Sequence, residues 1–180
     1  MNVRRRQKSL EARKADNAEV TDPSLVLAAA LRFLEARPRS TTEVRRRLLT
    51  RGYRADLVDG CVQRLLDLDI LDDAAFARTW VESRDRARPR GERALRAELH
   101  GKGINREVVE GVLEARTVEQ PAADADAARR VLERHASALG RVTDPRARRQ
   151  RAYALLARSG FDSETAVEAI GEFLGGSERI

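Results

Sequence analysis

The sequence predicts an all-α fold made of three tandem three-helix repeats that form an elongated, curved stack. Apolar residues recur at helical spacing from Ser24 onward, and no segment alternates apolar and polar residues as a half-buried strand does. A helix-ending glycine also recurs, at Gly52, Gly103 and Gly160, and each is followed by an acidic helix start. Recurrence of one helical module is typical of repeats that bury each other's apolar faces.

The N-terminal segment, residues 1–22, is polar and carries six Lys or Arg residues and four Asp or Glu residues. Its few apolar residues form no repeating stripe that could pack on the repeats. We therefore expect a disordered or fraying arm over this segment.

The first repeat is predicted over residues 23–71. Its first helix, residues 25–36, carries apolar residues at i, i+4 and i+7, namely Leu27, Leu31 and Leu34. Ser40 and Glu43 form a capping box at the start of the middle helix, which ends at Gly52. The third helix has its own apolar stripe, at Leu57, Cys61 and Leu65.

The second and third repeats are predicted over residues 72–116 and 117–180. Their first helices are expected over residues 72–84 and 122–139. Residue types that cap helix N-termini precede the later helices, at Asn105, Asp144 and Asp162. The order of the elements therefore matches the order found in the first repeat.

The three glycines share an apolar register. The residues eight and four positions before each glycine are apolar, and so is the residue directly after it. The position after the glycine holds Tyr53, Ile104 and Phe161. A residue at this position packs back on the last helical turn, so we expect these three side chains in the core. We expect the same of apolar residues on the helical stripes, namely Phe76, Trp80 and Cys61.

The residue content argues against catalysis and against a metal site. The only cysteine, Cys61, excludes an internal disulfide, and the two histidines, His100 and His135, stand at no recognised zinc spacing. Gly101-Lys102 resembles the end of a phosphate loop, but Arg96 occupies the position of that loop's first glycine. Other catalytic motifs are missing as well. We expect a protein that is not an enzyme and has no cofactor and no metal.

The sequence also lacks the marks of a membrane or exported protein. No apolar run approaches the roughly 20 residues of a membrane span, and no apolar segment follows the basic N-terminus as in a secretory signal. We therefore expect a cytoplasmic monomer that has no contact with a membrane.

Positive charge is concentrated in the middle helices. Residues 40–54, 89–103 and 144–160 together hold 14 Lys or Arg and four Asp or Glu, whereas the whole chain has a net charge of only +6. Stacked repeats would align these helices in a basic stripe that suits a polyanion or an acidic protein groove. Arginines near a helix C-terminus also offset the helix dipole, which is an alternative reason for their position.

A short basic connector, residues 84–91, joins the first two helices of the second repeat and is stiffened by Pro89. Guanidinium groups suit bidentate contacts with phosphates or carboxylates, so this connector and residues 45–47 are the candidate contact surface. Aromatic residues make up only 4% of the chain, too few for a base-stacking platform. Any contact with nucleic acid should be made to the phosphate backbone, without sequence specificity.

Several short sequence motifs between residues 25 and 115 follow one another in an order and spacing that point to a known family. They are LRFLEARPRS (residues 31–40), EVRRRL (43–48), RGY (51–53), LDDAAFA (71–77), RPRG (88–91), LRAEL (95–99) and KGI (102–104). In this order and spacing they resemble the RecX family of recombination regulators. The third repeat resembles the family only loosely, and residues 1–22 lie outside its pattern.

The resemblance implies three tandem repeats in a curved molecule that lies in the groove of the RecA–DNA filament, bridges RecA protomers and reaches the DNA. It implies inhibition of RecA ATP hydrolysis, strand exchange and co-protease activity, and so a role in DNA repair and the SOS response, without catalysis. The matching basic positions, which receive the RecA and DNA contact role, are Arg45, Arg46, Arg47, Arg51, Arg88, Arg90, Arg96 and Lys102.

The residues alone equally fit a freestanding, sequence-nonspecific DNA-binding or RNA-binding protein, or a helical adaptor for an acidic protein. A polyanion binder should lose affinity for any duplex steeply between about 50 and 200 mM salt. A filament regulator should bind tightly only when RecA and nucleotide are present.

Overall fold

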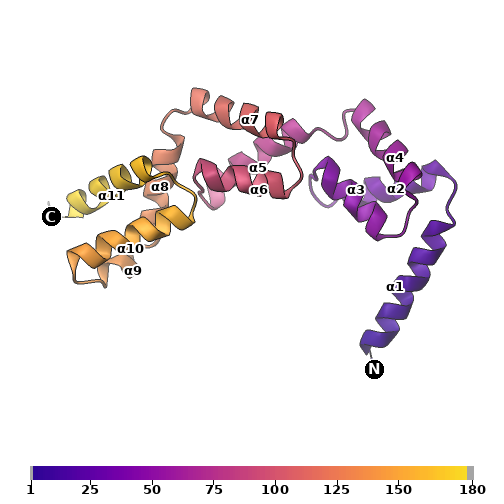
Figure 1. Ribbon diagram of the computed structural model, residues 1–180, viewed down its shortest axis with the longest axis horizontal. Coiled ribbons are helices and arrows are strands. Elements are labelled where there is room, and N and C mark those ends of the chain that lie inside the picture. The colour runs from indigo at the N-terminus through magenta and orange to yellow at the C-terminus, as the bar shows by residue number, and fades with distance from the viewer. Residues whose placement is uncertain (1, 178–180) are drawn as a thin grey trace. The chain divides into compact units, whose positions relative to one another are not determined.

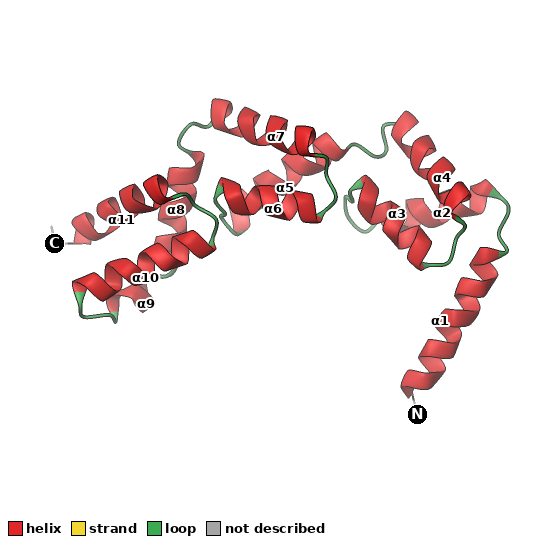
Figure 2. Ribbon diagram, in the orientation of Figure 1, coloured by secondary structure: helices red, strands yellow, loops and turns green. Residues whose placement is uncertain are grey.

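The computed structural model describes residues 2–177, and every regular element in that range is an α-helix (Figures 1 and 2). The helices are α1 (Asn2–Ala18), α2 (Pro23–Leu34), α3 (Thr41–Thr50), α4 (Ala55–Asp67), α5 (Asp73–Ala87), α6 (Glu92–Gly101), α7 (Arg106–Glu119), α8 (Ala123–Arg134), α9 (Ala136–Gly140), α10 (Pro145–Arg158) and α11 (Ser163–Ser177). The all-α prediction is confirmed for the described part of the chain.

The helices form two compact units. Unit 1 extends up to Phe76 and includes Lys102–Ile104, whereas unit 2 comprises Ala77–Gly101 and the described residues from Asn105 onward. In unit 1, helices α2, α3 and α4 all contact one another. They correspond to the three helices predicted for the first repeat.

The core of unit 1 uses one face of each of these three helices. Its buried side chains are Val26 and Ala30 of α2, Val44 and Leu48 of α3, Val58, Cys61, Val62 and Leu65 of α4, and Leu71. The predicted capping box is confirmed: the Ser40 hydroxyl accepts from the Glu43 N–H, and the Glu43 carboxylate accepts from the Ser40 N–H. This box fixes where α3 begins and therefore which of its side chains face the core.

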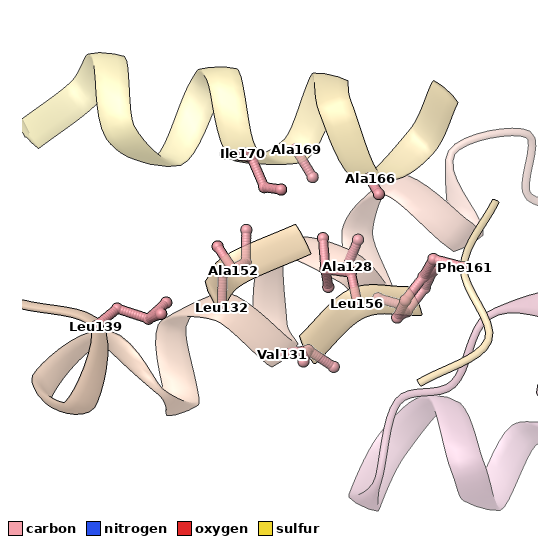
Figure 3. Packing of buried hydrophobic residues seen from close by; sticks show 11 residues of the cluster. Ala128, Val131, Leu132, Leu139, Ala152, Leu156, Phe161, Ala166, Ala169 and Ile170 are labelled. Atoms are coloured by element: carbon pink, nitrogen blue, oxygen red, sulfur yellow. The ribbon is translucent and has the colours of Figure 1, made fainter. Parts of the chain in front are cut away.

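The main core of unit 2 lies between α8, α10 and α11. Figure 3 shows Ala166, Ala169 and Ile170 of α11 on the side that faces the residues of α8 and α10. The opposing residues include Ala128 and Leu132 of α8 and Ala152 and Leu156 of α10. Small side chains at many of these positions let the helix backbones approach closely.

One helix that the sequence predicts as continuous, residues 122–139, is broken in two. The backbone leaves the helical region at His135, between α8 and α9, and the His135 ring contacts the Val131 carbonyl oxygen at 2.9 Å. The break has a packing reason, because Leu139 beyond it belongs to the same buried cluster as Leu132 before it.

The three helix-ending glycines are confirmed by their backbone geometry. Gly52, Gly103 and Gly160 have φ values of 98°, 77° and 89°, in the left-handed region that favours glycine. Each also lies against another helix: a Cβ atom on Gly52 would lie 2.5 Å from the Lys14 carbonyl oxygen, and one on Gly160 would lie 2.5 Å from the Ala94 nitrogen. These residues therefore end a helix and also allow another segment to pack against that end.

The apolar residues after these glycines behave largely as predicted. Ile104 and Phe161 are each only 3% exposed, and the half-buried Tyr53 packs against the core of unit 1. Phe76 and Cys61 are buried as expected. Trp80 is only partly buried. Its position is explained by its polar edge, since the indole N–H donates to the Glu98 carboxylate at 2.8 Å.

The N-terminal segment differs from the expected disordered arm, because residues 2–18 form α1. The segment is rich in Arg, Lys and Ala, which favour the helix without needing an apolar stripe. The amide of Asn17 donates to the Arg51 carbonyl oxygen at 2.7 Å, and Val20 packs against the core of unit 1. Helix propensity and these contacts account for the order of the segment.

Replacing Gly160 with alanine should destabilise the protein by at least about 2 kcal/mol, because alanine is strained at this φ and its methyl group would overlap Ala94. The matched control is Gly171→Ala in α11, where nothing lies within 4 Å of the added carbon. That control should gain about 0.5 to 1 kcal/mol. Urea unfolding followed by circular dichroism measures both, and equal midpoints for the two variants would contradict the prediction.

Candidate protein and nucleic-acid interface

The arginines of α3 differ in whether a carboxylate holds them. Arg45 forms an ion pair with Asp59 of α4 at 2.7 Å, with both side chains about half exposed. Arg46 and Arg51 are exposed and have no ion-pair partner among the described residues. Arg47 is exposed, and its guanidinium carbon lies 5.3 Å from the centre of the Phe33 ring. Helix α3 and the residue directly after it therefore present three guanidinium groups that no carboxylate of the described chain neutralises.

The arginines in and beside the connector between α5 and α6 also differ in whether a carboxylate holds them. Arg88 is exposed and unpaired among the described residues, whereas Arg90 lies 3.8 Å from a Glu98 oxygen. Glu98 accepts at the same time from Trp80 and from Arg84, whose guanidinium stacks 4.5 Å from the Trp80 ring centre. One carboxylate therefore holds Arg84 of α5 and Arg90 of the connector, and Arg88 lies between them.

Arg96 of α6 is held by two carboxylates. It contacts Glu92 at 2.6 Å and Glu110 of α7 at 2.8 Å. Hydrogen bonds to Glu110 and Glu92 raise the pKa of the Arg96 guanidinium above its usual range. These contacts tie α6 to α7, so Arg96 has a structural role in unit 2.

Lys102 lies in a network at the start of α3. Its ammonium group lies 3.0 Å from Glu43, and its backbone carbonyl accepts from the Ser40 hydroxyl at 2.7 Å. Burial pushes the pKa of Glu43 upward, but the hydrogen bonds from Lys102 and from the Ser40 N–H outweigh it and leave the pKa lowered. Thr41 completes the network, since its N–H donates to Asp73.

The eight predicted contact residues thus differ in whether a carboxylate holds them and in the unit to which they belong. Carboxylates hold Arg45, Arg90, Arg96 and Lys102, whereas Arg46, Arg47, Arg51 and Arg88 have no ion pair within the described residues. Helix α3 and Lys102 lie in unit 1, and the other three residues lie in unit 2. The structure therefore places Arg46 and Arg47 in the C-terminal half of α3 and Arg51 directly after it.

Two features of the charge distribution were missed from the sequence. Arg39 stacks on the same ring as Arg47, 4.1 Å from the centre of Phe33. In unit 2, Arg116 is only 7% exposed and bonds Asp85 at 2.9 Å and Asp124 at 2.6 Å. The helical spacing of Arg116 from the buried Val109 and Val112 was a signal that could have placed this arginine in the core.

The described residues contain neither a metal-binding cluster nor a helix that could span a membrane. Within residues 2–177, no three His, Cys, Asp or Glu side chains are grouped so that they could hold a metal ion. No helix in the same range has both the length and the apolar character that crossing a bilayer requires.

Comparison with known proteins identifies the relatives of this chain. Residues 27–65 match the sequence model of the first three-helix domain of RecX, and residues 72–113 match that of the second. The chain is 37% identical over 147 residues to the regulatory protein RecX of Mycobacterium avium, covering 79% of this chain and 81% of that protein. It is 34% identical over 143 residues to the one from Mycobacterium tuberculosis, covering 79% and 82%.

Two solved structures have a similar fold. The crystal structure of RecX from Lactobacillus salivarius has a TM-score of 0.68 at 22% identity, covering 83% of this chain and 95% of that one. A second crystal structure, of a regulatory protein RecX, has a TM-score of 0.72 at 19% identity, covering 86% and 73%.

The Glu43 network predicts a pH-dependent contribution to stability. Because the folded-state pKa of Glu43 lies below its ordinary value of 4.5, its contribution is present above that value and is lost as the pH falls through the folded-state pKa. Glu43→Gln should therefore be less stable than the wild type by about 1 kcal/mol near neutral pH, and the difference should shrink below about pH 4.

Urea midpoints at several pH values measure this difference. The control is Glu35→Gln at the end of α2, an exposed residue with no ion pair among the described residues. A gap between Glu43→Gln and wild type that stays constant with pH would show that the ionised carboxylate is not what stabilises α3.

Proposed function

This chain belongs to the RecX family of regulatory proteins, and we propose that it regulates RecA by binding the RecA–DNA filament. The observation that carries the proposal is a set of guanidinium groups that no carboxylate of the described chain neutralises, on Arg46 and Arg47 of α3 and on Arg51 directly after it. Such groups suit bidentate contacts with phosphates and carboxylates, which a nucleoprotein filament presents together.

The proposed regulation is inhibition. A body that occupies the filament groove and contacts neighbouring RecA protomers would hold them in one arrangement, which would restrain ATP hydrolysis, strand exchange and co-protease activity. The protein would act as a cytoplasmic monomer in DNA repair and the SOS response, without catalysis or a cofactor. Its contacts with DNA would be made to the phosphate backbone and would not depend on sequence.

The predicted contact residues would have two roles. We assign direct contact with the filament to Arg46, Arg47, Arg51 and Arg88, because a partner can bind these residues without breaking an ion pair of the described chain. Arg45, Arg90, Arg96 and Lys102 would contact a partner only after exchanging a carboxylate that already holds them. Exposed pairs such as Arg45 with Asp59 exchange at low cost, since such pairs contribute about 0 to 1 kcal/mol.

We also propose that residues 117–180 are the third repeat and share the regulatory surface. The support is local: Gly160 ends α10 as Gly52 ends α3, and Phe161 is buried after it. Helix α10 carries exposed arginines without ion pairs in the described chain, at Arg146, Arg149 and Arg151.

The alternative function is sequence-nonspecific binding of free DNA or RNA. The exposed arginines favour it as much as they favour a filament partner. The two functions differ in their salt dependence, because binding to free duplex would weaken by orders of magnitude between about 50 and 200 mM salt. Binding that requires RecA and nucleotide would support the filament regulator.

Charge reversal on α3 tests the proposed function. The variant Arg45→Glu, Arg46→Glu, Arg47→Glu should abolish inhibition of RecA ATP hydrolysis while leaving the helical circular dichroism unchanged, because all three side chains are exposed. The measurement is RecA ATPase activity on DNA, titrated with each protein at fixed salt.

The matched control reverses three exposed arginines on other helices, Arg64, Arg78 and Arg106. It changes the net charge equally and should keep most of the inhibition. Retained inhibition by the α3 variant would remove these residues from the contact surface. Equal loss in both variants would indicate an effect of net charge alone.

A further inference from the structure

A groove of about 650 Å³ lies between α1 and the C-terminal half of α3, within unit 1. Basic residues from both helices line it: Arg13 and Lys14 from α1, Arg47 from α3, and Arg51 directly after α3. Tyr53 also lines it. A cavity of this size is in the range that encloses small ligands or one or two units of a polymer.

The walls of the groove are held together by the backbone. The absence of a Cβ on Gly52 lets the Lys14 backbone approach, since an added carbon would lie 2.5 Å from the Lys14 carbonyl oxygen. The Asn17 amide donates to the Arg51 carbonyl at 2.7 Å, which satisfies a carbonyl group at the end of α3. Helix α1 is therefore fixed against the end of α3 by contacts that leave its basic side chains available.

The cations of the groove are not neutralised within the described chain. None of Arg13, Lys14, Arg47 and Arg51 forms an ion pair there, whereas the neighbouring Arg45 and Arg54 pair with Asp59 and Asp56. The guanidinium of Arg47 lies over the Phe33 ring, 5.3 Å from the ring centre, and this cation–π contact orients it without a carboxylate. Two carboxylates, Glu11 and Asp16, also line the groove.

This combination fits nucleic acid better than an acidic peptide. Four cations suit the successive phosphates of a strand, and a half-buried tyrosine suits a base. Carboxylates accept hydrogen bonds from the amino group of cytosine but repel a run of other carboxylates. The volume fits an unpaired strand, whereas a duplex needs a broad open face.

We propose that the α1–α3 groove binds single-stranded nucleic acid, with the phosphates on its four cations and a base against Tyr53. This proposal rests on the proposed function, which brings the protein to DNA. It deepens that function because it places a strand in contact with α1, a segment that lies outside the family's pattern. Arg13 and Lys14 would supply contacts beyond those of the three-helix repeats.

The test uses the full chain and a fluorescein-labelled oligodeoxycytidine of about 16 nucleotides, with no RecA present. Binding is followed by fluorescence anisotropy over a series of salt concentrations. Arg13→Ala with Lys14→Ala should weaken binding about tenfold at low salt and reduce the salt slope by about 1.4, because two phosphate contacts are lost. The Lys14 backbone that touches Gly52 is unchanged in this variant.

A matched control removes two exposed arginines outside the groove, by Arg64→Ala with Arg78→Ala. This variant should bind within about twofold of wild type. A second variant, Tyr53→Leu, keeps apolar packing but removes the ring, and should lose roughly fivefold or more. Circular dichroism and the melting temperature of each variant show whether it is folded.

Several outcomes would overturn the proposal. They are failure of the wild type to bind the oligonucleotide, equal losses in the groove and control variants, and equally strong competition by a duplex of the same length or by polyglutamate. The RecA ATPase titration is a separate measurement. Its failure would overturn the proposed function while leaving the result on the oligonucleotide intact.

Discussion

The architecture depends on one constraint: another segment packs closely against the end of a helix, and only a glycine at that end leaves room for it. Gly52, Gly103 and Gly160 each end a helix in the left-handed region and receive a neighbouring segment where a Cβ atom would lie. The same backbone conformation therefore ends α3, α6 and α10 and lets another segment pack against each of these ends. At Gly52 the neighbour is α1, a segment outside the two matched domains.

Ion pairing separates the arginines that build the protein from those available to a partner. Arg116 and Arg96 connect helices of unit 2 through carboxylates, and burial makes the Arg116 contacts especially important. Removal of one member of a buried ion pair leaves an uncompensated charge that destabilises by roughly 3 to 5 kcal/mol. Arg46, Arg47 and Arg51 form no ion pair with a carboxylate of the described chain. Ion pairing therefore distinguishes the arginines that are available to a partner, which net charge and position along the chain do not.

The features predicted from the sequence were those determined locally. The capping box at Ser40 and the glycine ends depend on residues only a few positions apart, and they were confirmed. The pairing of Arg45 with Asp59 and of Arg96 with Glu110 depends on how adjacent helices pack, which composition and spacing do not give. Helix α1 has no apolar stripe that could predict it from the sequence, and its order comes from intrinsic helix propensity and from docking on Gly52.

The chain contains a single cysteine and a single tryptophan, and they lie in different units. Cys61 is buried in unit 1, and burial raises the pKa of its thiol, so an alkylating reagent would react with it faster when that unit opens. Trp80 in unit 2 keeps its indole against Glu98 and Arg84, and its emission would change when that contact is lost. The unmodified protein thus carries one chemical and one optical reporter, with which the opening of each unit can be followed separately.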